Sequence, residues 1–309
     1  MGITITVLIL LIFGGLELLL RLVWGLGKRP LYIADKDIGY LLAPNQQVRR
    51  VGNLMEINQY SQRTETVTQE LPKNTLRILL LGDSIANGAW WTDQEQTISA
   101  LIETQLSDLD HQQIQVLNAS ANSWGPRNQL AYLKRFDTFN AQVIVLLLNT
   151  DDLFATAPTS IAVGKDINLP TDQQPLAILE LLERIINRKR DIPGMAEVVA
   201  EPGDRVGLNL AAINQIHQIA KEHNSQFLLA ITPLLREVNS TEQRKYEQKA
   251  RERLDKLCKD NNIAFLDFIP IFQRQDEVAM LYRDTIHLTE EGNQLVSQKL
   301  SDMIRDTAR

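Results

Sequence analysis

The sequence feature that most constrains the fold is an uninterrupted apolar run that ends in a polar turn. Residues 78–81 read Ile-Leu-Leu-Leu, and Gly82, Asp83 and Ser84 follow directly. An apolar run without alternation is typical of a strand that is buried on both faces of a parallel sheet. Ligands bind at the carboxyl ends of the strands in such sheets. Ser84 is therefore predicted to lie where a substrate would be bound.

The rest of the chain continues this pattern of strands and helices. Strands are predicted at residues 114–117, 143–148, 227–231 and 263–266, and helices at residues 96–106, 129–136, 176–186, 208–222, 242–259 and 292–304. Strands that alternate with helices imply a parallel sheet with right-handed crossovers. We therefore expect an α/β fold with a five-stranded parallel sheet.

A serine at the end of a strand needs a base before it can act as a nucleophile. The segment Asp284-Thr285-Ile286-His287 offers one near the other end of the chain. A short turn there can bring the carboxylate to Nδ1 of the imidazole while Nε2 faces the serine. In the alternative interpretation, Ser84 only caps the following helix and His287 lies in an ordinary surface loop.

Together, the Gly82-Asp83-Ser84 turn and the late Asp284-x-x-His287 pair resemble the SGNH/GDSL hydrolase superfamily. Its members are serine esterases and acyl-ester transferases, and the resemblance covers about residues 75–305. It implies a three-layer, flavodoxin-like sheet of five parallel strands. It also implies that Ser84 is the nucleophile, His287 the base, and Asp284 the residue that orients the base.

The same resemblance predicts an oxyanion hole that departs from the family pattern. The family uses the N–H of the nucleophile, here Ser84, the N–H of a glycine and the side chain of an asparagine. In the second motif, residues 118–125, the glycine position falls on Ser123, and Gly125 is the alternative if the loop shifts by two residues. A serine can still donate its backbone N–H there if its dihedral angles are allowed.

The third motif of the family, Gly-x-Asn-Asp, aligns with residues 149–152. Asp151 then replaces the asparagine donor, although an ionised carboxylate only accepts hydrogen bonds. Asn149, two residues earlier, is the alternative donor, and a polar turn without a catalytic role is the alternative interpretation of the whole segment.

Three tryptophans lie near these motifs: Trp90, Trp91 and Trp124. Aromatic rings with a polar tip suit contacts with a sugar or an acyl group, and they also suit packing in the core. No His/Cys cluster, P-loop or dinucleotide glycine pattern is present, so we expect neither a metal nor a cofactor. A net charge of -6 gives no indication of nucleic-acid binding.

The most hydrophobic segment is residues 3–26, which Glu17 and Arg21 interrupt. About 20 apolar residues span a bilayer as a helix, and the two charged residues stand four apart, so they can pair on one helical face. A cleaved signal peptide fits less well, because no basic region precedes the segment and no cleavage site of small residues follows it. We predict a single-pass anchor in residues 1–27 that adds little to the stability of the domain.

Two arguments disagree on the direction of this anchor. Lys28, Arg29, Arg49 and Arg50 follow the apolar segment, and the positive-inside rule would keep the domain in the cytoplasm. The family resemblance suggests the opposite, because anchored relatives commonly act outside the cytoplasmic membrane. We expect the extracytoplasmic side on that ground.

The remaining boundaries follow from composition. Residues 28–74 are predicted to form a linker or N-terminal extension, in which Asn58 and Arg63 resemble a family motif with Ser61 in place of its glycine. Residues 75–309 are predicted to form the hydrolase domain, with residues 153–205 as an insertion and candidate lid.

The resemblance implies a serine ester hydrolase that acts on a carbohydrate- or lipid-linked acyl ester through an acyl-enzyme. Its expected partners are therefore an acyl-ester substrate and the membrane. The alternatives are an O-acyltransferase that acts on a glycan, and a membrane-tethered binding protein whose catalytic chemistry has degraded.

Overall fold

A parallel sheet forms the centre of the molecule. The computed structural model describes residues 2–109, 113–186, 191–238 and 243–307. The strands lie in the order β6 (Gln113–Ser120), β5 (Thr75–Gly82), β7 (Val143–Asn149), β8 (Gln226–Thr232) and β9 (Ala264–Asp267), and all neighbours are parallel. This is the flavodoxin-like order, so the predicted five-stranded sheet is confirmed.

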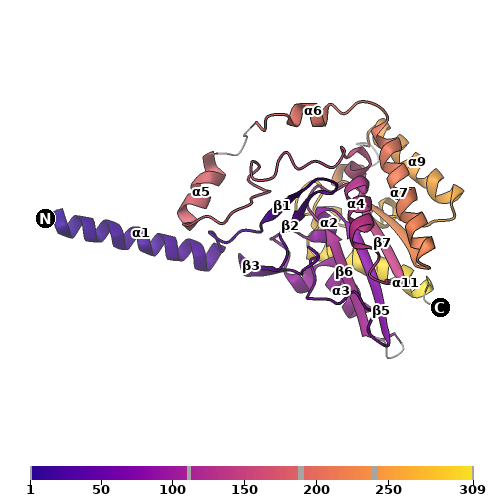
Figure 1. Ribbon diagram of the computed structural model, residues 1–309, viewed down its shortest axis with the longest axis horizontal. Helices are drawn as coiled ribbons and strands as arrows, with labels where there is room; N and C mark the ends of the chain where they lie inside the picture. Colours follow the sequence, from indigo (N-terminus) through magenta and orange to yellow (C-terminus); the bar gives the residue numbers. More distant parts are fainter. Residues whose placement is uncertain (1, 110–112, 187–190, 239–242, 308–309) are drawn as a thin grey trace.

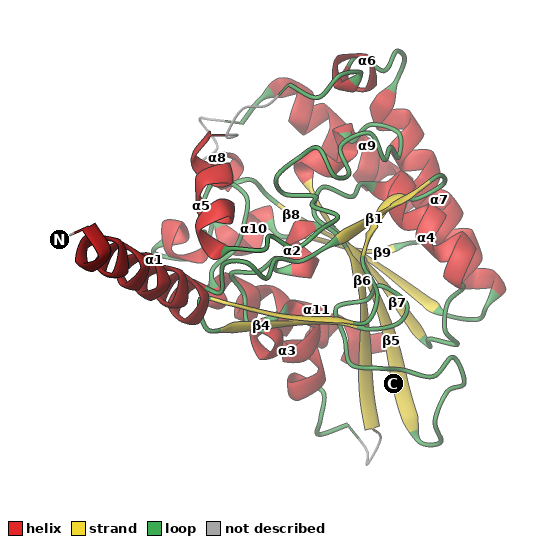
Figure 2. Ribbon diagram, turned by 60° about the vertical axis from the view of Figure 1, so that its left-hand side comes forward, coloured by secondary structure: helices red, strands yellow, loops and turns green. Residues whose placement is uncertain are grey.

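Helices cover both faces of the sheet (Figure 2). One core lies under α4 (Pro126–Phe136), α7 (Arg205–Glu222) and α9 (Lys245–Asp260), and the other under α3 (Ile98–Gln105) and α11 (Glu290–Thr307). Leu79 and Leu81 of β5 belong to the first core, whereas Ile78 and Leu80 belong to the second. This division explains why the apolar run shows no alternation.

Short helices connect these layers. They are α2 (Ser84–Asn87), α5 (Ala177–Ile186), α6 (Met195–Val199), α8 (Leu235–Val238), α10 (Ile269–Phe272), and the 3₁₀ turns η1 (Gln94–Gln96), η2 (Thr150–Phe154) and η3 (Val278–Leu281). The predicted helix over residues 176–186 corresponds to α5. No strand falls within the described part of the 153–205 insertion.

Of the two alternatives for residues 28–74, a linker or an N-terminal extension, the structure has a folded extension. This segment forms two antiparallel hairpins, one of β1 (Tyr32–Asp35) and β2 (Gly39–Leu42), the other of β3 (Gln46–Arg50) and β4 (Asn53–Ile57). Tyr32, Ile38, Leu42, Met55 and Ile57 are buried in the same core as α4. The strands are only four or five residues long, too short for a clear period-two pattern to show in the sequence.

Arg63 ties this N-terminal extension to the segment that follows Ser84. Its side chain is fully buried and donates hydrogen bonds to the backbone carbonyls of Asn87, Ala89 and Thr92. Ser61, in the glycine position of the suggested motif, has a left-handed φ of 61°. The extension therefore belongs to the folded domain and holds the loop beside the proposed nucleophile.

Helix α1 (Gly2–Trp24) projects away from the domain (Figure 1). Among the described residues it is the one helix that is long and apolar enough to cross a membrane. Glu17 and Arg21 pair through an Nε–Oε1 distance of 2.6 Å, as predicted. The Glu17 carboxylate also accepts hydrogen bonds from the backbone N–H groups of Ala177 and Ile178 at the start of α5.

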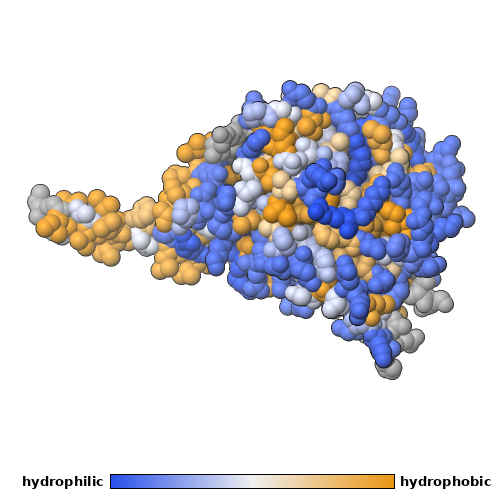
Figure 3. Space-filling model, viewed as in Figure 1, coloured by the Kyte–Doolittle hydropathy of each residue, from blue (hydrophilic) through white to orange (hydrophobic). Residues whose placement is uncertain are grey.

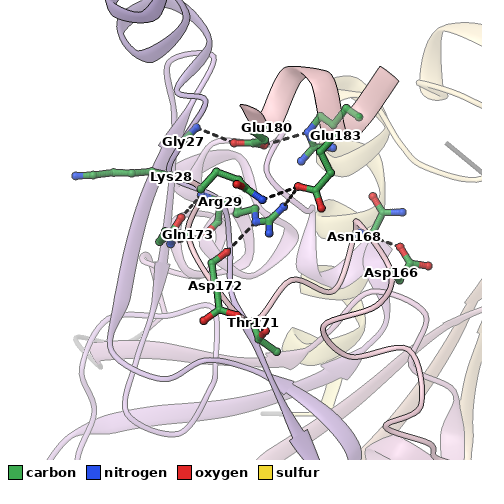
Figure 4. Close-up of polar contacts among 12 residues, drawn as sticks. Gly27, Lys28, Arg29, Asp166, Asn168, Thr171, Asp172, Gln173, Glu180 and Glu183 are labelled. Atoms are coloured by element: carbon green, nitrogen blue, oxygen red, sulfur yellow. Dashed lines mark hydrogen bonds and ion pairs between the residues drawn. The ribbon is translucent and has the colours of Figure 1, made fainter. Parts of the chain in front are cut away.

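A second carboxylate fixes the point where α1 ends. Glu180 accepts a hydrogen bond from the Gly27 N–H at 2.7 Å and pairs with Arg50 at 2.8 Å. The side chains of Arg50 and Glu180 are only 3% and 0% exposed. Next to them, Arg29 pairs with Glu183 at 2.8 Å (Figure 4). These contacts, with Leu20 and Leu26 packed on α5, run against the expectation that residues 1–27 add little to stability.

Two truncated chains test this attachment. A chain that begins at Gly15 keeps the contacts of Glu17, Leu20 and Leu26 with α5, whereas a chain that begins at Lys28 loses them. Full burial of one leucine contributes about 1.5–3 kcal/mol, so we expect the shorter chain to be less stable by about 3 kcal/mol. Thermal unfolding of both chains in the same detergent measures the difference. Equal midpoints would show that α1 is attached without stabilising the domain.

Candidate active site

Ser84 lies where strand β5 passes into α2, and the local sequence explains the tight turn. A Cβ atom on Gly82 would lie only 2.4 Å from Cβ of Ala86, so the glycine allows the helix to fold back onto the strand. The Asp83 carboxylate caps α2 by accepting the Ile85 N–H at 2.8 Å. Ser84 is therefore the first residue of α2, at the carboxyl edge of the sheet as predicted.

The structure brings Ser84, His287 and Asp284 together. Nε2 of His287 lies 3.0 Å from Oγ of Ser84, and its Nδ1 lies 2.7 Å from Oδ2 of Asp284. A carboxylate only accepts hydrogen bonds, so Nδ1 carries the proton and Nε2 is left to accept from the serine hydroxyl. The geometry is that of a nucleophile, a base and an orienting acid.

Asp284 is held in its ionised form by its own turn. Burial raises the pKa of this carboxyl, but hydrogen bonds from the backbone N–H and imidazole of His287 and from the Ile286 N–H outweigh burial, so its pKa is lowered. The Trp91 ring stands edge-on to the imidazole, with 5.0 Å between the ring centroids. The base is therefore fixed from two sides.

A cavity of about 250 Å³ lies beside the serine. Ser84, Trp90, Trp91, Ser123 and His287 line it. The N-terminal extension and the insertion also line the cavity, through Arg29, Pro30, Tyr32, Met55, Ile167, Asn168, Pro170 and Arg184. The insertion thus supplies one wall of the cavity.

Trp124, predicted as a substrate contact, lies elsewhere. Its side chain is buried in the core, packs on Tyr132, and donates its indole N–H to the carbonyl of Tyr40 at 3.0 Å. The ring therefore joins hairpin β1–β2 to α4. This correction could not come from the sequence, because the acceptor is distant along the chain.

The second motif supplies backbone donors to the cavity. Ser123 has a φ of 62° in the left-handed region, which suits the glycine position assigned to it. Neither its N–H nor that of Ser84 has a hydrogen-bond acceptor within the described residues. The Gly125 N–H, the alternative donor, is instead bonded to Oδ1 of Asn128 at 3.0 Å.

Asn149, the alternative donor, does not line the cavity. Its buried amide donates to Oδ2 of Asp83 at 2.6 Å and accepts the Asp151 N–H at 2.7 Å. Its backbone N–H donates to Asp152 at 2.9 Å. Asn149 thus supports the Asp83 turn from the neighbouring strand, and it is a positioning residue.

Asp151 is also placed outside the cavity, and its predicted role is corrected with that of Asn149. Because the Asn149 side chain caps η2, the next turn directs Asp151 to the surface. Although the residue is exposed, partial desolvation of its carboxyl raises the pKa of Asp151, and the nearby Arg236 opposes this shift. Its electrostatic neighbours are Arg236, Glu247 and Arg244. None of these residues lines the cavity.

Asn122, which no sequence motif singled out, lines the cavity next to Ser123. Its backbone carbonyl accepts a hydrogen bond from the Tyr40 hydroxyl at 2.5 Å. Its side-chain oxygen is buried and has no hydrogen-bond partner among the described residues. The only available signal was its position directly before the glycine site of the second motif.

The comparisons with known proteins agree with this site. A model of the GDSL-like Lipase/Acylhydrolase family matches residues 80–295, a range that includes Ser84, Asp284 and His287. The chain belongs to this family. It is therefore an enzyme that hydrolyses ester bonds. No curated protein sequence matches it. No group of three or more His, Cys, Asp or Glu side chains in the described ranges could hold a metal ion.

Several solved structures resemble this family member. An acetyl xylan esterase, AlAXEase, is 15% identical with a TM-score of 0.49, covering 74% of this chain and 99% of its own. A protein described as lipolytic, of the G-D-S-L family from Desulfitobacterium hafniense DCB-2, is 16% identical with a TM-score of 0.47, covering 74% and 98%. A catalytic mutant of an acetylxylan esterase from Geobacillus stearothermophilus is 12% identical with a TM-score of 0.48, covering 72% and 91%. None of them identifies a substrate for this chain.

The position of Asp151 leads to a prediction about its replacement. Because the carboxylate lies outside the cavity, Asp151→Asn is expected to change kcat by no more than about twofold, against the 10²–10³ expected of a group in the oxyanion hole. The measurement is kcat against pH on p-nitrophenyl acetate, with Asp151→Ala as the matched control. A large gain in the Asn variant alone would place this residue at the oxyanion after all.

Proposed function

We propose that this GDSL-family enzyme is a serine ester hydrolase that works through an acyl-enzyme on Ser84. The observation that carries the proposal is the continuous hydrogen-bonded series from Asp284 through His287 to Ser84, which opens onto a cavity. Oγ of Ser84 attacks the ester carbonyl while Nε2 of His287 takes its proton. The ester C–O bond then breaks, and the leaving alcohol receives that proton. A water molecule next gives a proton to His287 and attacks the acyl carbon, and the bond to Ser84 breaks as Oγ takes this proton and the acid is released.

The negative charge that develops on the carbonyl oxygen needs donors. The backbone N–H groups of Ser84 and Ser123 are proposed as two of them, because both residues line the cavity and neither N–H has a partner within the described ranges. The Asn122 amide is proposed as the third. It would replace the asparagine that the family contributes from the end of β7.

The substrate is proposed to be an acyl ester carried by a carbohydrate or a lipid. Trp90 and Trp91 give the cavity aromatic faces, and Arg50 lies 5.4 Å from the centroid of the Trp90 ring. Acyl transfer to a glycan hydroxyl is the second candidate, since the Ser84 chemistry is the same up to the acyl-enzyme. Loss of an acyl donor that depends on an added glycan would distinguish transfer from hydrolysis.

Helix α1 is proposed as a single-pass membrane anchor, with the catalytic domain on the extracytoplasmic side. Its length and composition support a span, and its apolar side chains are exposed along most of its length. Protease access from outside intact cells tests the orientation.

The three residues of the site should behave as one unit. Ser84→Ala and His287→Ala are each expected to reduce kcat on p-nitrophenyl acetate by at least about 10³, and the double variant should be scarcely worse. His223→Ala is the matched control, because this histidine ends α7 and forms no contact with the cavity. A Ser84→Ala protein that is folded and retains most of its rate would exclude Ser84 as the nucleophile.

The proposed third donor has its own test. Asn122→Ala is expected to lower kcat by about 10²–10³ while leaving KM nearly unchanged, because the amide would act mainly in the transition state. Ser123→Gly serves as the control, since glycine adopts the left-handed conformation of this position without strain and keeps the N–H. If Asn122→Ala retained full kcat, the backbone N–H groups alone would form the hole.

A further inference from the structure

Helix α5 carries an apolar face that no described part of the chain covers. Leu179, Leu182, Ile185 and Ile186 are 42%, 45%, 64% and 75% exposed. Their spacing places them along one side of the helix. The other side is buried, because Ala177 packs on α1 and Glu180 holds Arg50 and Gly27. The exposed leucines and isoleucines therefore form a stripe, which we call the α5 apolar face.

This face is continuous with the apolar surface of α1. The Glu17 carboxylate caps the first turn of α5, and Leu20 and Leu26 pack against Ala177 with Ile178 and Leu181. Figures 1 and 2 show α5 running across the end of α1 rather than along it. In Figure 3, the hydrophobic colouring of α1 continues onto the adjoining edge of the domain.

We infer that α5 lies in the surface layer of the bilayer that α1 spans, with the α5 apolar face turned towards the acyl chains. The inference rests on the membrane anchor of the proposed function. Glu17, which caps α5, precedes Trp24 at the end of α1 by about 10 Å of helix rise. Amphipathic helices at membrane surfaces bury their apolar face by about 5–10 Å. The start of α5 therefore lies at about the depth at which an amphipathic helix is buried in a membrane surface.

The arrangement turns the catalytic cavity towards the same membrane. Arg184 on α5 and Arg29, five residues after α1, both line the cavity with Ser84. Arg184 pairs with Glu180 at 3.0 Å, and Glu180 also holds the Gly27 N–H. An ester that is carried by a lipid and exposed at the headgroup level would then meet Ser84 without leaving the bilayer.

The test uses the full chain in phospholipid vesicles, with a polarity-sensitive NBD label on a single introduced cysteine. The native Cys258 is 2% exposed, and burial raises its pKa to about 12, so it resists labelling. Ile185→Cys places the label on the α5 apolar face. Leu208→Cys is the matched control, because it is an exposed apolar residue on α7, away from α1.

We expect the label at residue 185 to be quenched by doxyl-labelled lipids and shielded from iodide in water. The label at residue 208 should show the opposite behaviour. Equal iodide access at both positions overturns the inference. Shielding at residue 185 without quenching from the lipid also overturns it, because a protein partner or a second copy would then cover the face.

A second measurement tests the consequence for catalysis. The variant Leu182→Gln/Ile185→Gln/Ile186→Gln is expected to hydrolyse p-nitrophenyl acetate in water at the normal rate. Its rate on p-nitrophenyl palmitate held in vesicles should fall at least about tenfold, with Leu208→Gln as control. Unchanged hydrolysis of the vesicle-held ester, or an equal loss on both esters, overturns the placement of the cavity. If the wild type hydrolysed neither ester, the proposed function would fail, while lipid quenching at residue 185 would still decide the position of α5.

Discussion

The close contact between β5 and α2 at Gly82 is the constraint on which the active site depends. A side chain there would meet Ala86, so the strand and helix could not form the sharp turn that exposes Ser84 at the sheet edge. The turn is then held from both sides. Asp83 caps α2, and Asn149 at the end of β7 donates to Asp83. His287 reaches this fixed serine from a loop more than two hundred residues later, so both partners depend on the same edge of the sheet.

The second organising interaction joins the N-terminal helix to the catalytic cavity. Glu180 is fully buried, and burial raises the pKa of its carboxyl, but Arg50, together with the Gly27 N–H and the charge of Arg184, outweighs this and the pKa is lowered. A buried ion pair contributes little net stability compared with an apolar replacement, yet loss of one partner is costly, at about 3–5 kcal/mol. Glu180 therefore acts mainly by positioning the groups that it binds. It fixes Gly27, the β3–β4 hairpin and Arg184 of the cavity wall relative to one another.

The sequence predicted those features that depend on local periodicity or on one short motif. The parallel sheet follows from alternating strands and helices, whereas its flavodoxin-like order and the roles of Ser84 and His287 follow from the family resemblance. The hairpins in residues 28–74 could not be predicted, because their short strands lack a clear period and their core contacts are formed with distant helices. Trp124 was misassigned for the same reason, since its partner Tyr40 lies far away in the sequence. Asp151 and Asn149 were misassigned because the capped η2 turn decides which side chains face the serine.

The carboxylates beneath the nucleophile explain why donors on the second-motif side are favourable. Burial raises the pKa of Asp83 and of Asp152, and the negative charge of Asp83 raises the pKa of Asp152 further. A third carboxylate aimed at the oxyanion would oppose the transition state directly. In this chain, Asp151 is exposed and has Arg236 and Arg244 as electrostatic neighbours, while Asn122 and Ser123, the proposed oxyanion donors, line the cavity. The aspartate in the asparagine position is therefore compatible with the proposed chemistry, in which Asn122 and Ser123 stabilise the oxyanion in its place.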